Sequence, residues 1–310
     1  MIKVEGLVKK FGDLCAVDHL QLQVLPGEVY GLVGPDGAGK TTSLRLLCGA
    51  LLPDEGTIKI ADFDVISQVE LARGQIGYLP QRFSLYEELT VLENLRFFAE
   101  VRGLKAANWR PRCMEILKFV GLDEFINRRA GYLSGGMKQK LGLAAALVHQ
   151  PRVLLLDEPT TGVDPVTRQD FWKLIIRLAA GDEISVLVTT PYMDEAARCS
   201  QVGFMARGKI LVEGPPGELN QRLAGRVLEL MGSPLARLRQ VALQQPGVED
   251  AQMFGDRLHI RVGPGELENV VANLSQEIPK QGGEIFRLRA IPPQLEDVFM
   301  DLLMISQDAS

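Results

Sequence analysis

The sequence predicts an α/β fold over about the first 220 residues and a smaller α+β module after it. Short apolar runs typical of buried strands alternate with longer helical stretches, as in a parallel sheet covered by helices. A glycine-rich segment, residues 34–42, joins one such run to a helix. Beyond residue 223 the expected order is β-α-β-β-α-β. We therefore expect two domains, residues 1–222 and residues 223–310, which suits a chain of 310 residues.

Strands of the first domain are expected where apolar or β-branched runs are bounded by turns or charges. These runs are Ile2–Val8, Leu20–Val24, Val29–Val33, Thr57–Ile60, Val153–Leu156 and Ile184–Thr189. A helix over Thr41–Leu52 should end at the turn formed by Pro53–Gly56. Residues 84–149 are rich in charged helical stretches and predict a helical subdomain. Thr90 and Glu93 have capping-box spacing at the start of one of its helices.

The second domain follows a hairpin and a terminating turn expected over residues 201–220. Its expected elements are strand Arg226–Leu230, helix Leu235–Leu243, strands Ala251–Phe254 and Leu258–Val262, helix Glu266–Ile278, strand Glu284–Leu288 and helix Leu295–Leu303. This part of the sequence has no metal-ligand spacing and no candidate nucleophile. Its expected role is therefore structural or regulatory.

Composition excludes several kinds of partner. The chain has 34 Lys and Arg against 39 Asp and Glu, a formal charge of −5, and no basic stripe, so nucleic acid is not expected. We find no run of 18 apolar residues and no N-terminal leader, so a protein of the cytoplasm is expected. The scattered cysteines Cys15, Cys48, Cys113 and Cys199 indicate reduced thiols that serve packing.

The segment GPDGAGKTT at residues 34–42 fits the phosphate-loop pattern G-x-x-x-x-G-K-[ST]. Glycines let backbone N–H groups close around phosphate oxygens, and a helix N-terminus adds its positive dipole end. Lys40 is expected to reach the β- and γ-phosphates, and the Thr41 hydroxyl to bind Mg²⁺. The alternative, an ordinary glycine-rich turn, rarely carries Lys-Thr at the helix start. The expected nucleotide contacts are Gly34, Pro35, Asp36, Gly37, Ala38, Gly39, Lys40, Thr41 and Thr42.

A second signal is the apolar run Leu154–Leu156 followed by Asp157 and Glu158. A buried strand that ends in two carboxylates suits the Mg²⁺ side of a phosphate-loop site. Asp157 would hold the metal, directly or through water, and Glu158 would accept a proton from the attacking water. An isolated Asp-Glu pair on a surface would be commonplace.

A second glycine pair, Gly135 and Gly136, follows Ser134 at the start of a helical run. A helix start of this kind forms an anion cradle, and one nucleotide does not need two such cradles. We therefore expect this one to meet the γ-phosphate of a nucleotide held by another subunit. The alternative is a plain helix start with Ser134 as its capping hydroxyl.

Together these motifs make residues 1–220 similar to the ATP-binding subunits of ABC transporters. Residues 34–42 resemble the Walker A element, and Asp157-Glu158 resembles the end of Walker B. Leu133–Met137 resembles the LSGGQ signature, with Met137 where glutamine is usual. In that family's head-to-tail dimer, each nucleotide touches the Walker A of one chain and the signature of the other. The resemblance implies ATP and Mg²⁺ as cofactors.

The resemblance also implies roles for residues outside these motifs. Gln81 lies where the family has its Q-loop glutamine, which senses Mg²⁺ and the attacking water. Asp164 matches the D-loop aspartate that communicates across the dimer. Phe11 lies where the family places an aromatic ring under the adenine, although a phenylalanine at a strand edge is commonly just packing.

Two further departures from the family pattern bear on nucleotide binding and hydrolysis. Asp36 replaces the usual asparagine and adds negative charge near the phosphates. In the switch loop, the segment Thr189–Ala196, Pro191 replaces the usual histidine. Proline has neither a side-chain donor nor a backbone N–H, and loss of one such donor typically slows a reaction by about 10²–10³. Slowed hydrolysis at this chain's own Walker A is therefore expected, and a heteromer with one competent site is plausible.

The resemblance implies an ATP-hydrolysing subunit of an exporter. Its partners would be separate transmembrane permease subunits and a second ATP-binding subunit, in a homodimer or a heterodimer, and the permease would hold it at the cytoplasmic face of the membrane. The permease should dock near Phe83, Leu85 and Tyr86, unless these three side chains are interior. The segment Pro292–Phe299 resembles the C-terminal extension of the daunorubicin-resistance-like branch of drug exporters, which implies dimer support or regulation.

Two other functions compete with this interpretation. One is a soluble ABC ATPase of DNA repair or ribosome work, but such proteins usually show coiled-coil insertions, zinc-binding cysteines or two cassettes. The other is a regulatory subunit that binds ATP and barely hydrolyses it. Pro191 favours the regulatory subunit, and the presence of Glu158 argues against it.

Overall fold

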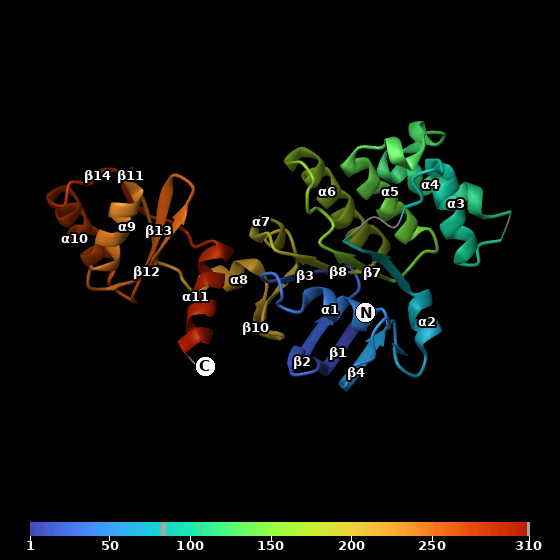
Figure 1. The fold of residues 1–310 in the computed structure, drawn as a ribbon, viewed down its shortest axis with the longest axis horizontal. Helices are drawn as coiled ribbons and strands as arrows, with labels where there is room; N and C mark the ends of the chain where they lie inside the picture. The colour runs from blue at the N-terminus through green and yellow to red at the C-terminus, as the bar shows by residue number, and fades with distance from the viewer. Residues whose placement is uncertain (82–84, 106, 309–310) are drawn as a thin grey trace. The chain divides into compact units, whose positions relative to one another are not determined.

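The computed structural model describes residues 1–81, 85–105 and 107–308 (Figure 1). By compactness the chain divides into two units, Met1–Glu213 and Gly214–Ser310. The first unit is α/β and the second α+β, so the expected fold class is confirmed. The domain boundary expected at residue 222 stays a prediction.

The first unit contains two sheets. An antiparallel sheet has the order β2-β1-β4-β5, and a six-stranded sheet has the order β10-β9-β3-β8-β7-β6. The strands are β1 Ile2–Phe11, β2 Leu14–Val24, β3 Val29–Val33, β4 Glu55–Ile60, β5 Phe63–Asp64, β6 Ile76–Leu79, β7 Val153–Asp157, β8 Ser185–Thr190, β9 Gln201–Ala206 and β10 Lys209–Gly214. Every residue of β3, β7 and β8 is buried, as the continuous apolar runs predict for central parallel strands.

The register of the parallel strands positions the site. Val33 at the end of β3 pairs with Thr190 at the end of β8, and Thr189 pairs with Asp157 at the end of β7. The carboxyl ends of these strands therefore meet at one edge of the sheet, where ligands bind in open α/β sheets.

The helices of the first unit are α1 Lys40–Leu47, α2 Val69–Gly74, α3 Val91–Val101, α4 Trp109–Val120, α5 Gly135–Leu147, α6 Pro165–Asp182 and α7 Met193–Ala196. Helices α3, α4 and α5 pack on one another and form the helical layer seen in Figure 1. The capping box at Thr90 and Glu93 is confirmed. The expected helix end at Leu52 is wrong, because Gly49 takes a φ of 67° and a Schellman motif closes α1.

The second unit has the expected β-α-β-β-α-β order, with antiparallel strands arranged β12-β13-β11-β14 as in ferredoxin-like folds. Its elements are α8 Pro216–Gln221, β11 Val227–Ser233, α9 Leu235–Leu243, β12 Val248–Phe254, β13 Arg257–Val262, α10 Leu267–Lys280, β14 Glu284–Ala290 and α11 Leu295–Asp308. Its core lies where α9 and α10 cover the sheet, around Leu230, Leu238 and Leu274. Helix α8 occupies residues where the sequence predicts only a turn.

Two further expectations concern the whole chain. Within residues 1–81, 85–105 and 107–308, no helix is both long and apolar enough to span a membrane. All four cysteines are free thiols. Burial raises the pKa of Cys113 to about 11, so this thiol is protonated at neutral pH and packs as an apolar group.

Candidate functional site

The glycine-rich loop connects the buried strand β3 to α1 at the carboxyl edge of the sheet. Gly34 is buried, and a Cβ atom there would lie 2.1 Å from the Met205 carbonyl oxygen, so only glycine fits. Gly39 caps α1 with a φ of 108°, and a Cβ atom added there would lie 2.3 Å from the Ala16 carbonyl oxygen. The loop backbone therefore needs glycine at both positions to bring its N–H groups to the start of α1.

Lys40, the first residue of α1, extends back over the loop. Its Nζ donates to the carbonyl oxygens of Gly34 at 2.8 Å and of Pro35 at 3.1 Å. The same Nζ lies 3.3 Å from Glu158 Oε1, and both side chains are less than a tenth exposed. The structure thus places a buried cation between the loop and the carboxylate at the end of β7.

Asp157 at the end of β7 is tied to two threonines. Thr41 Oγ1 donates to Asp157 Oδ1 at 3.0 Å, and Thr189 Oγ1 donates to the same oxygen at 2.9 Å. The Tyr78 hydroxyl lies 3.5 Å from Asp157 Oδ2. Burial raises the pKa of Tyr78, and the nearby Asp157 carboxylate adds to this effect, so Tyr78 keeps its proton and remains a donor.

Glu158 follows β7 in a left-handed backbone conformation, with a φ of 46°. Such a conformation is unfavourable for a residue with a side chain and needs support from its surroundings. The Glu158 N–H donates to the Thr189 carbonyl oxygen at 3.1 Å and to Thr189 Oγ1 at 3.0 Å. Gln81 Nε2 donates to Glu158 Oε2 at 3.0 Å. The expected partners Gln81, Lys40 and Glu158 therefore meet at one point.

The switch loop begins at the end of β8. Pro191 is half-buried, and Thr190 Oγ1 accepts a hydrogen bond of 3.0 Å from the Tyr192 N–H. Farther along the loop, Glu195 is only 1% exposed. Its Oε2 accepts a hydrogen bond from Thr190 Oγ1 at 2.6 Å, and its Oε1 accepts one from Thr160 Oγ1.

The signature segment lies at the start of α5. Ser134 caps the helix, with its Oγ accepting from the Met137 N–H at 3.3 Å. Gly135 faces open space, whereas a Cβ on Gly136 would lie 2.1 Å from Thr167 Cγ2 at the start of α6. Asp164 caps α6 through its Oδ1, which accepts from the Thr167 N–H at 3.0 Å. The signature and Asp164 therefore lie at two helix starts in contact.

Other expected contacts lie at the margin of the site or outside the described residues. Phe11 is the last residue of β1 and is 48% exposed. Its ring centroid lies 5.6 Å from Lys9 Nζ, which sits over the ring. Asp36 is exposed at the tip of the loop. Tyr86 is 48% exposed and Leu85 is half-buried, so the interior alternative does not hold for Tyr86. Phe83 lies outside the described residues.

Sequence reasoning missed several residues of this site. Tyr78 and Thr189 contact Asp157, and Thr160, in the turn after the two carboxylates, contacts Glu195. Threonine and tyrosine are common residue types and form no motif there. In the sequence, Glu195 is one residue of the segment that surrounds Pro191, and nothing there singles it out. A buried carboxylate at the third position of a four-residue helix cannot be told from an exposed one by sequence.

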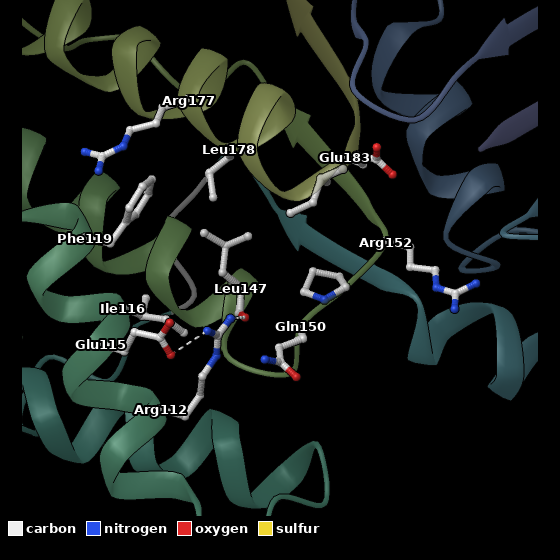
Figure 2. A pocket seen from close by; sticks show the side chains of 13 residues that line it. Arg112, Glu115, Ile116, Phe119, Leu147, Gln150, Arg152, Arg177, Leu178 and Glu183 are labelled. Atoms are coloured by element: carbon white, nitrogen blue, oxygen red, sulfur yellow. Dashed lines mark hydrogen bonds and ion pairs between the residues drawn. The ribbon is translucent and has the colours of Figure 1, made fainter.

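A cavity of about 610 Å³ lies elsewhere, between α4, the end of α5 and the end of α6 (Figure 2). Arg112 on its wall pairs with Glu115 and donates to the Leu147 carbonyl oxygen, and Arg177 lies over Phe119. The cavity opens near the amino ends of β7 and β8, whereas the glycine-rich loop and the carboxylates lie at the carboxyl ends. It contains none of the expected site residues.

The carboxyl-edge residues fit a magnesium-bound nucleoside triphosphate. Gly34 and Gly39 make a loop whose backbone can approach phosphate oxygens, and Lys40 supplies a buried positive charge beside it. Thr41 and Asp157 place two oxygens 3.0 Å apart, a donor set that suits Mg²⁺ with phosphate and water as further ligands. Glu158 lies beside Lys40 and Gln81, where a base is needed.

Comparison with known proteins identifies the family. The model of the ABC transporter family matches residues 17–161. The probable multidrug ABC transporter ATP-binding protein YbhF of Escherichia coli is 41% identical over 98% of this chain and 52% of its own length. This chain thus spans about half of YbhF. The Nod factor export ATP-binding protein I of Paraburkholderia xenovorans is 38% identical, over 97% of this chain and 96% of its own.

Solved structures agree with this result. The dimeric bacterial ABC transporter cassette MJ0796 matches with a TM-score of 0.63 and 28% identity, over 69% of this chain and 98% of that one. The same cassette has been solved in a dimeric post-hydrolysis state bound to ADP and Pi. CbiO1 of Clostridium perfringens, part of an ABC transporter complex, matches with a TM-score of 0.66 and 26% identity, over 79% and 95%. The chain belongs to the family of ABC transporter ATP-binding proteins.

Proposed function

We propose that this chain binds MgATP and hydrolyses it at a dimer interface, to drive export through separate membrane subunits. The observation that carries the proposal is the meeting of Lys40, Glu158 and Gln81 beside the Thr41–Asp157 pair, at the end of β7 and the start of α1. The export function rests on relatives that are named as multidrug and Nod factor exporters.

Each residue has a distinct role in this proposal. The loop N–H groups and Lys40 bind the phosphates, and Thr41 and Asp157 hold Mg²⁺, which neutralises phosphate charge when bound. Gln81 orients the attacking water, and Glu158 accepts its proton as the water oxygen bonds to the γ-phosphorus and ADP leaves. Phe11 is exposed enough to stack on the adenine.

The dimer is proposed from the signature segment. Ser134 uses its hydroxyl to cap α5, so its presence alone fits the plain helix start. Gly135, however, faces open space, which leaves room for a second chain's γ-phosphate. We propose that Ser134–Met137 serve a partner's nucleotide, and that Asp164 contacts the partner, in a homodimer or a heterodimer. The exposed Tyr86 is a proposed anchor for the permease.

The slow hydrolysis implied by Pro191 remains part of the proposal. Proline cannot donate to a γ-phosphate, so this chain's own site should turn over slowly, while its signature can still serve a competent partner. If no partner restores activity, the regulatory subunit that binds ATP without hydrolysis becomes the better function.

The test compares ATP binding and hydrolysis in the unmodified protein and three variants. Lys40→Ala should weaken binding of labelled ATP, whereas Glu158→Gln should bind ATP and lose hydrolysis. A Glu115→Gln variant, far from the site on α4, is the matched control for loss of one carboxylate. Equal ATP affinity in Lys40→Ala and the unmodified protein would refute the site. Sedimentation with membranes separates a transporter subunit from a soluble ATPase. A transporter subunit should sediment with membranes only when its permease is present, and a soluble ATPase should not.

A further inference from the structure

The carboxylate of Glu195 occupies an unusual place for a charged group that does not touch the proposed nucleotide site. It lies in α7, is 1% exposed, and accepts hydrogen bonds from Thr190 Oγ1 and Thr160 Oγ1. Arg168 Nε lies 3.5 Å from its Oε1. A buried carboxylate is costly unless its oxygens are satisfied, and here both are.

The two threonines belong to the two chain segments around the strained residue Glu158, one in the turn after it and one at the end of the neighbouring strand β8. Thr160 is two residues after Glu158, in the turn where the Thr161 N–H donates to the Glu158 carbonyl oxygen at 3.2 Å. Thr190 directly follows Thr189, which receives the Glu158 N–H on both its carbonyl and its hydroxyl oxygen. One carboxylate thus joins the start of the switch loop to the turn after the proposed catalytic base.

This arrangement matters because Glu158 has a φ of 46°. A residue other than glycine keeps a left-handed backbone conformation only where neighbouring groups hold the backbone in place. Thr189 supplies the direct hydrogen bonds, and Glu195 fixes the segments that carry Thr189 and the Glu158 turn. Without the Glu195 carboxylate, both segments lose a common anchor.

We propose that Glu195 is a positioning residue that holds Glu158 in the backbone conformation needed for proton abstraction. The inference rests on the proposed ATPase function and adds to it a residue that contacts neither phosphate loop nor carboxylate pair. Arg168 supports Glu195 from α6, where its guanidinium also lies 4.6 Å from the Tyr192 ring centroid. Since Asp164 caps α6, Arg168 on that helix connects Glu195, and through it the base, to the proposed dimer contact.

The test uses Glu195→Gln and Thr160→Val, each of which removes one side of the anchor and keeps the side-chain size. Both should lower kcat at least about tenfold while KM for ATP stays within about twofold, because the phosphate loop is untouched. Thr160→Ser keeps the hydroxyl and should keep most of kcat. The double variant should fall no further than the worse single one, since both act through one anchor.

The matched control is Asp194→Asn, which removes the charge of the neighbouring acid. The Asp194 side chain is 62% exposed, and its Oδ2 lies 3.9 Å from Arg168 Nη1. This variant should leave kcat unchanged. Amide hydrogen exchange provides a readout that needs no ATP. Glu195→Gln and Thr160→Val should speed exchange in residues 157–161 by about tenfold or more and leave residues 34–42 unchanged.

Several outcomes would overturn the inference. Unchanged kcat and unchanged exchange in both variants would do so, as would a rise in exchange that is equal in residues 34–42 and 157–161. If the unmodified protein neither binds nor hydrolyses ATP, the proposed function fails, and the exchange comparison still decides whether Glu195 holds the Glu158 segment. If Glu195→Gln does not fold, Thr160→Val decides alone.

Discussion

Alanine at Gly135 and alanine at Gly136 should separate the structural from the functional requirement of the signature segment. A Cβ on Gly136 would lie 2.1 Å from Thr167 Cγ2, whereas one on Gly135 has no heavy atom within 4 Å. Gly136→Ala must therefore push the start of α6 away from α5, and overpacking of this kind costs about 1–3 kcal/mol. A Tm loss of roughly 2–12 °C follows, at about 2–4 °C per kcal/mol for a unit of this size.

Gly135→Ala should behave in the opposite way. Alanine is preferred over glycine within helices by up to about 1 kcal/mol, so the Tm should stay constant or rise slightly. The added methyl group would occupy the surface proposed for the partner's γ-phosphate. ATP-dependent dimerisation, and hydrolysis in the dimer, should therefore be lost in a protein of undiminished stability.

The assay is thermal unfolding of the unmodified protein and both variants, together with size-exclusion chromatography with and without MgATP. Gly136→Ala combined with Thr167→Ser, which lacks the clashing Cγ2, is the control and should recover part of the lost Tm. A Tm for Gly135→Ala as low as that of Gly136→Ala would refute the packing argument. Normal ATP-dependent dimerisation of Gly135→Ala would refute the proposed role of the signature.

Two further predictions concern stability. Burial, with a smaller contribution from the charge of Arg102, lowers the pKa of His149 to about 4 from its usual 6.5. The folded protein thus takes up this proton less readily than the unfolded chain, so stability is full above about pH 6.5 and falls towards pH 4, by on the order of 1–3 kcal/mol after allowing for solvent screening. His149→Gln, which keeps a donor for the Ile76 carbonyl oxygen, should flatten that part of a urea-unfolding pH series, and an unchanged slope would contradict the assignment. Thr90→Ala removes the cap of α3 and should lower stability by about 1 kcal/mol, whereas Thr90→Ser should not; equal loss in both would show that the hydroxyl is not the cause.

The elements that can be predicted from the sequence are those whose signal is local. Helix Leu235–Leu243 has the bounds that its sequence predicts, and the apolar runs of β3 and β7 indicate buried strands. The end of α1 is harder to predict because a Schellman motif depends on one residue, Gly49, in a left-handed conformation. Proline and glycine farther along, at Pro53–Gly56, give a stronger but later stop signal.

The candidate site divides in the same way. Lys40, Asp157 and Glu158 belong to motifs with fixed spacing, so the amino-acid sequence is enough to predict that they meet. Glu195 and Thr160 meet across 35 residues, and only the pairing of β7 with β8 brings their segments together. Interactions that depend on strand register, between residue types that are common on surfaces, leave no pattern in one sequence.

The replacement of Pro191 by histidine provides a clean test of chemistry, because the surrounding network does not involve residue 191. The bonds that fix the switch loop use the hydroxyls of Thr160 and Thr190, the Glu195 carboxylate and the Tyr192 N–H. Pro191 contributes no N–H to them, and its half-buried position leaves part of the side chain in solvent. A histidine should therefore enter without rearranging the loop.

A gain in single-turnover hydrolysis by Pro191→His would then report the added donor alone. The expected gain is up to about 10²–10³, the usual effect of one donor to developing charge, with ATP affinity nearly unchanged. Pro191→Gln, whose donor lies on a more flexible side chain and is held less precisely, should gain less, and Pro191→Ala should gain nothing. If Pro191→Ala gains as much as Pro191→His, release of the rigid φ rather than a new donor is the cause. No gain in any variant would mean that Pro191 does not limit hydrolysis.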